Sequence, residues 1–230
     1  MASPESWSAQ SALAGEEALH LALVDACGRL GLDISALQGK LLMAYLGLLE
    51  RWNATYNLTS VRDPRQMLTQ HLADCLAVIG PLRRHLGNVR GRRVLDVGSG
   101  GGLPGLVIAA LEPELEVTCV DTVGKKAAFI RQAGGELGLP NLRVEHARVE
   151  QLLARPFDLI TARAFASLAD LVRLTSMQLA PRGVWMAMKG RISPEELSGV
   201  PGTAEVFHVE PLAVPGLNAE RCLVWIRART

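Results

Sequence analysis

The stretch Val94-Leu95-Asp96-Val97-Gly98-Ser99-Gly100-Gly101-Gly102-Leu103-Pro104-Gly105 decides the fold of this chain. Its first four residues are apolar except for Asp96, as in a buried strand. A glycine-rich turn follows, and the apolar run 106–111 then predicts a buried helix. Glycines let a backbone approach a ligand closely, and a helix N-terminus offers unpaired N–H groups. The stretch therefore predicts a strand, a ligand-binding turn and a helix that open an α/β domain.

Two glycine patterns overlap in this turn, and they favour different ligands. One begins at Gly98, and the other, Gly100-x-Gly102-x-x-Gly105, formally matches the dinucleotide motif. A dinucleotide would place its pyrophosphate beside the Asp96 carboxylate, which repels it. S-Adenosylmethionine has no phosphate, and its ammonium and sulfonium groups are attracted to a carboxylate. We therefore favour the methyl donor and keep an NAD-linked oxidoreductase as the alternative.

Asp121 ends the next predicted strand, where an acidic side chain can accept hydrogen bonds from ribose hydroxyls. Both cofactors contain a ribose, so Asp121 indicates a nucleotide without choosing between them. Capping the helix that follows is the competing role for this carboxylate.

Composition indicates a soluble protein with a substantial core. Of the 230 residues, 49% are apolar and 20% are charged, and the net charge is +1. No apolar run is long enough to cross a bilayer, and the first residues do not resemble a secretion signal. The four cysteines lie far apart, which indicates neither a zinc site nor a disulfide framework. We therefore expect a cytoplasmic protein without a metal. A monomer is our starting expectation, although the sequence carries no signal of oligomeric state.

Helical spacing dominates the residues before the glycine-rich stretch. We expect residues 1–15, rich in Ser and Ala, to form a mobile tail, and residues 16–92 to form a helical extension packed on the core. Ser35 and the pair Asp63-Pro64 are typical helix starts, and Pro81 is expected to end the third helix. Residues 93–230 would then form the S-adenosylmethionine-binding domain.

Strand and helix patterns alternate from residue 93 onward. Apolar or alternating runs predict strands at 94–97, 116–121, 142–145, 157–161, 184–189, 206–209 and 222–226. Helices are predicted at 104–111, 124–137 and 168–179, with Ser167 as the cap of the last. This order predicts an open, doubly wound α/β sheet with an antiparallel edge.

The glycine-rich turn is followed along the chain by a series of short motifs. They are Asp121 with Gly124-Lys125-Lys126 and Phe129, then Arg148-Val149-Glu150, Phe157-Asp158, Arg163-Ala164-Phe165-Ala166 and Lys189-Gly190. Upstream lie Trp52-Asn53, Tyr56-Asn57-Leu58-Thr59, His71 and Asp74. Taken together, residues 35–190 resemble the bacterial 16S rRNA guanine-N7 methyltransferases, the glucose-inhibited division protein B family.

The resemblance implies a Rossmann-like, seven-stranded S-adenosylmethionine-dependent methyltransferase fold with an N-terminal helical extension. It implies methyl transfer to N7 of one guanine in 16S rRNA, with the small ribosomal subunit as partner. By position, the donor contacts would be Gly98, Leu103, Val149, Glu150 and Arg163. The residues added from their places around the turn are Asp96, Gly100, Gly102 and Asp121. A small-molecule methyltransferase is the alternative enzyme.

The chemistry of guanine N7 agrees with the motifs that the sequence lacks. N7 has a free lone pair and no proton to lose, so its methylation needs no general base. The Asp/Asn-Pro-Pro-aromatic motif of amine methylation and the Pro-Cys of carbon methylation are both absent. Catalysis would then rest on positioning the methyl group in line with N7 and excluding water. The positioning candidates are Arg163, Phe165, Asn57 and Lys189.

Arginines cluster directly before the glycine-rich stretch, in the basic segment 83–93. Such a segment can contact RNA phosphates, and a solvated loop is the alternative. The RNA-binding candidates are Arg62, His71, Arg83, Arg84, Arg90, Arg92 and Arg93. Neutralising Arg83, Arg84 and Arg90 should weaken rRNA binding and flatten its salt dependence.

Overall fold

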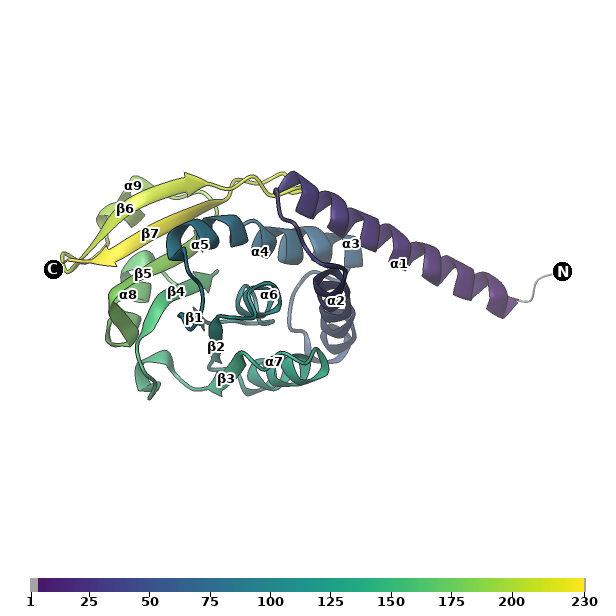
Figure 1. Ribbon diagram of the computed structural model, residues 1–230, viewed down its shortest axis with the longest axis horizontal. Coiled ribbons are helices and arrows are strands. Elements are labelled where there is room, and N and C mark those ends of the chain that lie inside the picture. Colours follow the sequence, from purple (N-terminus) through teal and green to yellow (C-terminus); the bar gives the residue numbers. More distant parts are fainter. Residues whose placement is uncertain (1–3, 230) are drawn as a thin grey trace.

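The computed structural model describes the backbone of residues 4–229 and the side chains of residues 14–229. Its 7-stranded sheet has the order β3-β2-β1-β4-β5-β7-β6 (Figure 1). The strands are β1 (Arg93–Val97), β2 (Glu116–Asp121), β3 (Leu142–His146), β4 (Phe157–Arg163), β5 (Leu179–Lys189), β6 (Ala204–Pro211) and β7 (Cys222–Ala228). Strands β1 to β5 pair in parallel, whereas β7 is antiparallel to β5 and β6. The predicted Rossmann-like sheet with an antiparallel edge is confirmed.

Helices pack on both faces of the sheet. On one face lie α6 (Gly105–Leu111) and α7 (Gly124–Glu136), and on the other lie α8 (Leu168–Thr175) and α9 (Pro194–Ser198). Successive residues of a strand point to opposite faces, so Val94 joins the first hydrophobic cluster and Leu95 the second. The short 3-10 turns η2 (Val149–Gln151) and η3 (Ser176–Gln178) follow β3 and α8.

The helices before β1 lie on the same face as α6 and α7. They are α1 (Pro4–Arg29), α2 (Ala36–Tyr56), α3 (Pro64–Met67), the π-helix η1 (Leu68–Ala73), α4 (Asp74–Leu76) and α5 (Ile79–Leu86). Buried side chains of α2, α6 and α7 belong to one hydrophobic cluster, so this extension shares its core with the sheet. Figure 1 shows α1 reaching outward from the body of the protein. None of the described helices is both long and apolar enough to span a membrane.

The predicted helix starts are confirmed by their hydrogen bonds. The Ser35 hydroxyl accepts the N–H of Gln38 at 3.2 Å, and the Gln38 side chain accepts the N–H of Ser35 at 2.9 Å. Asp63 caps α3, and Ser167 caps α8 through the N–H of Asp170. These side chains satisfy N–H groups that have no partner within their helices.

Local predictions differ from the structure at the N-terminus, at Pro81 and in the helix predicted at 168–179, which ends at Thr175. Residues 4–15, part of the expected tail, form the first part of α1, which fits their three alanines and Glu5. The tail residues 1–3 lie outside the described residues. Pro81 does not end a helix: it lies in the first turn of α5, where its missing N–H would have had no helical partner. Arg83 and Arg84 are consequently helical, not part of a loop.

Candidate functional site

The glycine-rich turn lies where β1 ends, at the carboxyl edge of the parallel strands. Open α/β sheets bind their ligands at this edge. The N–H of Gly98 donates to the carbonyl oxygen of Val120 at 2.9 Å, which holds the turn against β2. Gly98 has a φ of +67°, and a Cβ at this position would lie 2.9 Å from Cδ2 of Phe165. The turn therefore requires glycine here, and it leaves open the space beside the phenyl ring.

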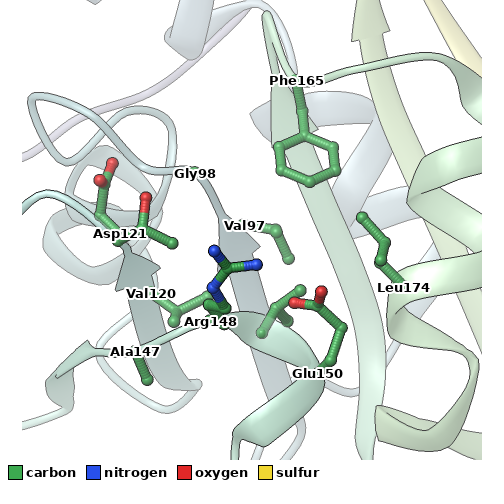
Figure 2. A pocket seen from close by; sticks show the side chains of 11 residues that line it. Val97, Gly98, Val120, Asp121, Ala147, Arg148, Glu150, Phe165 and Leu174 are labelled. Carbon is green, nitrogen blue, oxygen red and sulfur yellow. The ribbon is translucent and has the colours of Figure 1, made fainter.

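A cavity of about 340 Å³ opens beside Gly98. Figure 2 shows Asp121 and Ala147 on one side, Phe165 and Leu174 on the other, and the Arg148 and Glu150 side chains between them. Its apolar lining comes from Val97, Val120, Ala147, Val149, Phe165 and Leu174, and its polar lining from Asp121, Thr122, Arg148 and Glu150. An apolar slot flanked by carboxylates suits a nucleoside. The flat base can pack on the apolar side chains, and the ribose hydroxyls can donate hydrogen bonds to the carboxylates.

Asp121 joins the turn to the cavity. One carboxylate oxygen accepts the N–H of Gly100 at 2.8 Å, and the other accepts the N–H of Val123 at 2.8 Å. Each carboxylate oxygen can accept a further hydrogen bond, so Asp121 can hold the turn and bind ribose hydroxyls at once. The competing role at the following helix is partly present, because Val123 is the N-cap residue of α7.

Asp96 does not line this cavity. Its side chain is fully buried, and its Oδ2 accepts the N–H of Gly105 at 2.9 Å, at the start of α6. Burial raises the pKa of the Asp96 carboxyl to about 6. A Cβ at Gly105 would lie 2.8 Å from this oxygen, so the close approach of helix and strand needs glycine. Asp96 thus positions α6 behind the turn, and its direct contact with the methyl donor stays a prediction.

The other predicted cofactor residues either line the cavity or shape the turn. Gly98, Asp121, Val149 and Glu150 line the cavity. Gly100 donates to Asp121, and the N–H groups of Gly102 and Leu103 donate to the Ser99 carbonyl at 2.8 and 2.9 Å, which shapes the turn. Six lining residues were not predicted as site residues, namely Val97, Val120, Thr122, Ala147, Arg148 and Leu174. Arg148 could have been found beside Val149, whereas Leu174 comes from α8 without a local signal.

Tyr45 of α2 supports the turn from the helical extension. Its hydroxyl donates to the carbonyl oxygen of Gly101 at 2.7 Å, and its side chain is fully buried. Burial raises the pKa of this phenol well above its ordinary value, so the hydroxyl keeps its proton and remains a donor. A Cβ at Gly101 would lie 3.3 Å from Leu49, also on α2. The extension therefore supports the site, and this role of Tyr45 was not predicted from the sequence.

Of the four positioning candidates, only Phe165 lines the cavity. Ala164 before it has a φ of +53°, an uncommon value for a residue with a side chain, and the chain turns sharply there. Lys189 donates to the carbonyl oxygen of Ala166 at 2.9 Å and so holds this loop. Asn57 ends α2 and accepts a 2.8 Å hydrogen bond from Arg62.

Arg163 does not line the cavity, and its side chain bonds the helical extension. Its Nη1 donates to Asp74 at 3.2 Å and to the carbonyl oxygen of Gln70 at 3.1 Å. Asp74 also binds Arg221, at 3.0 Å. Nearby, His71 is buried with its Nε2 2.8 Å from the Thr59 hydroxyl, and burial together with Arg163 lowers its pKa. The structure therefore places His71 inside the protein, not on an RNA-contacting surface.

The basic segment 83–93 carries acidic partners. The pairs are Arg83 with Glu112, Arg84 with Glu210, Arg92 with Asp158 and Arg93 with Glu116. Arg92 and Arg93 lie at the amino end of β1, opposite the edge that holds the cavity. Arg62 and Arg90 have exposed side chains. The arrangement does not bring the basic segment to the cavity.

The described residues contain no group of three or more His, Cys, Asp or Glu side chains arranged to hold a metal ion.

Comparison with known proteins identifies the relatives of this chain. The model of the family described as rRNA small subunit methyltransferase G matches residues 38–224. A ribosomal RNA small subunit methyltransferase G of Leptothrix cholodnii is 61% identical over 87% of this chain and 92% of its own length. One of Methylibium petroleiphilum is 56% identical over 93% and 96%.

Solved structures share the fold at low sequence identity. TrmN from Thermus thermophilus has a TM-score of 0.54 at 20% identity, covering 70% of this chain and 53% of that one. A mutant of MtNAS in complex with S-adenosylmethionine has a TM-score of 0.56 at 15% identity, covering 89% and 83%. The sheet order, the turn and cavity at its carboxyl edge, and the family match over most of the sequence agree, and the chain belongs to the rRNA small subunit methyltransferase G family.

Proposed function

We propose that the protein transfers a methyl group from S-adenosylmethionine to N7 of a guanine in 16S rRNA of the small ribosomal subunit. Family membership supports the donor and the class of RNA, and it leaves the NAD-linked and small-molecule alternatives without support. The choice of N7 comes from the resemblance of the motifs and from the chemistry of the site.

The cavity beside Gly98 is the proposed donor site. Bound there, S-adenosylmethionine would supply an electrophilic methyl group on a sulfonium. Asp121 would accept hydrogen bonds from the ribose, and the apolar wall around Val149 would hold the adenine, with Glu150 at its edge. The opening that Gly98 leaves beside Phe165 supports this fit, because any side chain at Gly98 would fill it.

The observation that carries the N7 assignment is the character of the side chains around this opening. Phe165 lies against Gly98, and a phenyl ring can stack on a guanine that has left its own stack. The acidic groups of the cavity, Asp121 and Glu150, are assigned to the donor. Methylation at N7 needs no proton acceptor, since the N7 lone pair forms the new N–C bond as the S–C bond breaks. Positioning and exclusion of water then supply the rate enhancement.

Small subunits from a strain that lacks this gene provide the test. We expect the purified protein and labelled S-adenosylmethionine to methylate one guanine of their 16S rRNA, and chain cleavage specific for N7-methylguanine should map it. Subunits from the parent strain are the control, because their site is already modified. Label on a different atom would contradict the N7 assignment, and no label on the RNA would contradict the substrate.

The proposal includes a monomeric protein that acts in the cytoplasm. Gel filtration at micromolar concentration tests the first statement, and cell fractionation tests the second.

A further inference from the structure

Two guanidinium groups, one of them from the last residue of β4, share one buried carboxylate. Arg163 Nη1 lies 3.2 Å from Oδ2 of Asp74, and Arg221 Nε lies 3.0 Å from Oδ1. The Asp74 side chain is only 3% exposed, whereas those of Arg163 and Arg221 are 22% and 28% exposed. Two positive charges on one negative charge leave a net positive charge at a partly buried position, where it is poorly screened.

Both guanidinium groups keep hydrogen-bond donors without a protein acceptor among the described residues. A guanidinium has five N–H donors. Arg163 uses Nη1 for Asp74 and Gln70, and Arg221 uses Nε for Asp74 and Nη1 for the Glu220 carbonyl. Neither residue has a buried donor that lacks a partner, so the remaining N–H groups reach the surface. Asp74 fixes the position of both guanidinium groups, and their remaining N–H groups are accessible to a ligand.

Arg221 also lines a second cavity, of about 480 Å³. This cavity lies between the end of β5 and the start of β7, with Arg191 and Glu220 as its other charged residues. Lys189 at the end of β5 pairs with Cys222 at the start of β7, and β5 runs parallel to β4. The second cavity therefore opens at the same carboxyl edge as the donor cavity. Arg163 ends β4 between them, two residues before Phe165.

We infer that Arg163 and Arg221, held on Asp74, form a binding site with Arg191 for a backbone phosphate of the substrate RNA. Planar guanidinium forks match the geometry of phosphate oxygens, and anchored side chains lose little entropy on binding. The anion belongs to the RNA and not to the methyl donor, because neither arginine lines the donor cavity. Glu220 opposes the anion, but its side chain is exposed and its charge is screened by solvent.

This inference rests on the proposed function, since it names the part of the substrate that lies beside the modified guanine. The site would hold the strand on one side of Phe165 while the donor occupies the other. A phosphate fixed in this way would orient the guanine that stacks on Phe165. Arg221 and Arg191 are thus RNA-binding residues, and Asp74 is a positioning residue that acts through the two arginines.

The test measures binding of small subunits from the deletion strain over a range of salt concentrations. We expect Arg221→Ala and Arg191→Ala each to weaken binding about tenfold and to lower the salt slope by about 0.7–0.9, the value for one lost phosphate contact on a single strand or duplex. The dissociation constant for S-adenosylmethionine should stay unchanged. Arg221→Lys keeps the charge and should keep most of the slope while losing affinity.

Arg182→Ala is the matched control, because Arg182 is an exposed arginine of β5 toward its other end. It should leave both constants unchanged. Thermal unfolding separates loss of the site from loss of the fold, and Arg191→Ala is the variant with no ion pair to break among the described residues. Unchanged salt slopes for Arg221→Ala and Arg191→Ala would overturn the inference, as would weaker donor binding with a normal slope.

Failure of the proposed function gives a different result. If the wild-type protein binds the subunits but methylates another atom, the N7 assignment is contradicted. The salt slopes of the arginine variants then still test the phosphate site. Wild-type protein that does not bind small subunits would overturn both.

Discussion

The hydroxyl of Tyr45 donates a 2.7 Å hydrogen bond to the carbonyl oxygen of Gly101, and this contact ties the helical extension to the ligand-binding turn. The two residues are separated by most of the extension and by β1. The turn is rich in glycine and has few side chains of its own to fix its shape. Its rigidity therefore depends on groups from elsewhere, and the side chains of Tyr45 and Asp121 both supply direct hydrogen bonds to it.

Removing the Tyr45 hydroxyl should weaken donor binding. In Tyr45→Phe the ring remains, but the Gly101 carbonyl loses its hydrogen-bond donor, so the turn becomes less ordered. A net hydrogen bond contributes about 0.5–1.5 kcal/mol, which corresponds to an increase of about two- to tenfold in the dissociation constant for S-adenosylmethionine. Isothermal titration calorimetry measures this dissociation constant. Tyr56→Phe is the control, because Tyr56 is 44% exposed. Equal donor affinity in the two variants would contradict the role of Tyr45.

Adding one methyl group at Gly98 should abolish binding of S-adenosylmethionine. Its effect on the free energy of unfolding should be small enough for the protein to stay folded. The new Cβ would lie 2.9 Å from Cδ2 of Phe165 and would occupy the opening beside the ring. The left-handed backbone adds about 1–2 kcal/mol of strain. Gly138→Ala is the matched control, since Gly138 has a φ of +62° and open space around it. Both variants should lose similar stability in chemical denaturation, and only Gly98→Ala should lose donor binding.

The buried carboxyl of Asp96 should make stability depend on pH. Its pKa is raised to about 6 in the folded protein, above the ordinary value of 3.8, so the folded state binds its proton more tightly than the unfolded state does. The free energy of unfolding should therefore fall as pH rises from about 4 to about 6, by up to about 3 kcal/mol from this group.

Asp96→Asn removes this titration. Denaturant unfolding of the wild type and the variant at several pH values gives the difference, which should shift in favour of the variant as pH rises. A difference that is the same at pH 4 and pH 7 would show that Asp96 titrates normally. Asn can still accept the N–H of Gly105, so the variant should fold.

The basic segment should contribute less to RNA binding than its composition indicates. Arg83 and Arg84 lie 2.6 and 2.8 Å from the carboxylates of Glu112 and Glu210. A paired arginine brings little net charge to a phosphate. We therefore now expect the combined Arg83→Gln, Arg84→Gln and Arg90→Gln variant to change the salt slope by no more than about one contact. A reduction of the salt slope by the value for two or more phosphate contacts would support the expectation that the basic segment binds RNA.

The sequence predicted the seven strands and the antiparallel edge of the sheet because its strands are short apolar runs separated by glycine and proline. The carboxyl-edge position of Gly98 and Asp121 followed directly, since Gly98 comes directly after β1 and Asp121 ends β2. Helix starts were equally clear, because Ser35, Asp63 and Ser167 act on residues only a few positions away.

Contacts between distant segments were not predictable in this way. Asp96 was assigned to the ligand from its charge, but the sequence does not tell whether a strand-end carboxylate faces the cavity or the helix behind it. The arginine cluster had the same ambiguity, because its acidic partners come from the residue after α6 and from β2, β4 and β6. The link of Arg163 and Arg221 through Asp74 joins three segments that no local pattern relates.

The shared core of α2, α6 and α7 limits how this enzyme can be recombined with its relatives. An exchange of residues 1–92 alone would separate Tyr45 from Gly101 and α2 from the two helices it packs against. The smallest segment that keeps these partners together runs from the start of α2 to the end of α7. A functional chimera should therefore exchange residues 36–136 as one block, even though this block crosses the boundary between the extension and the sheet.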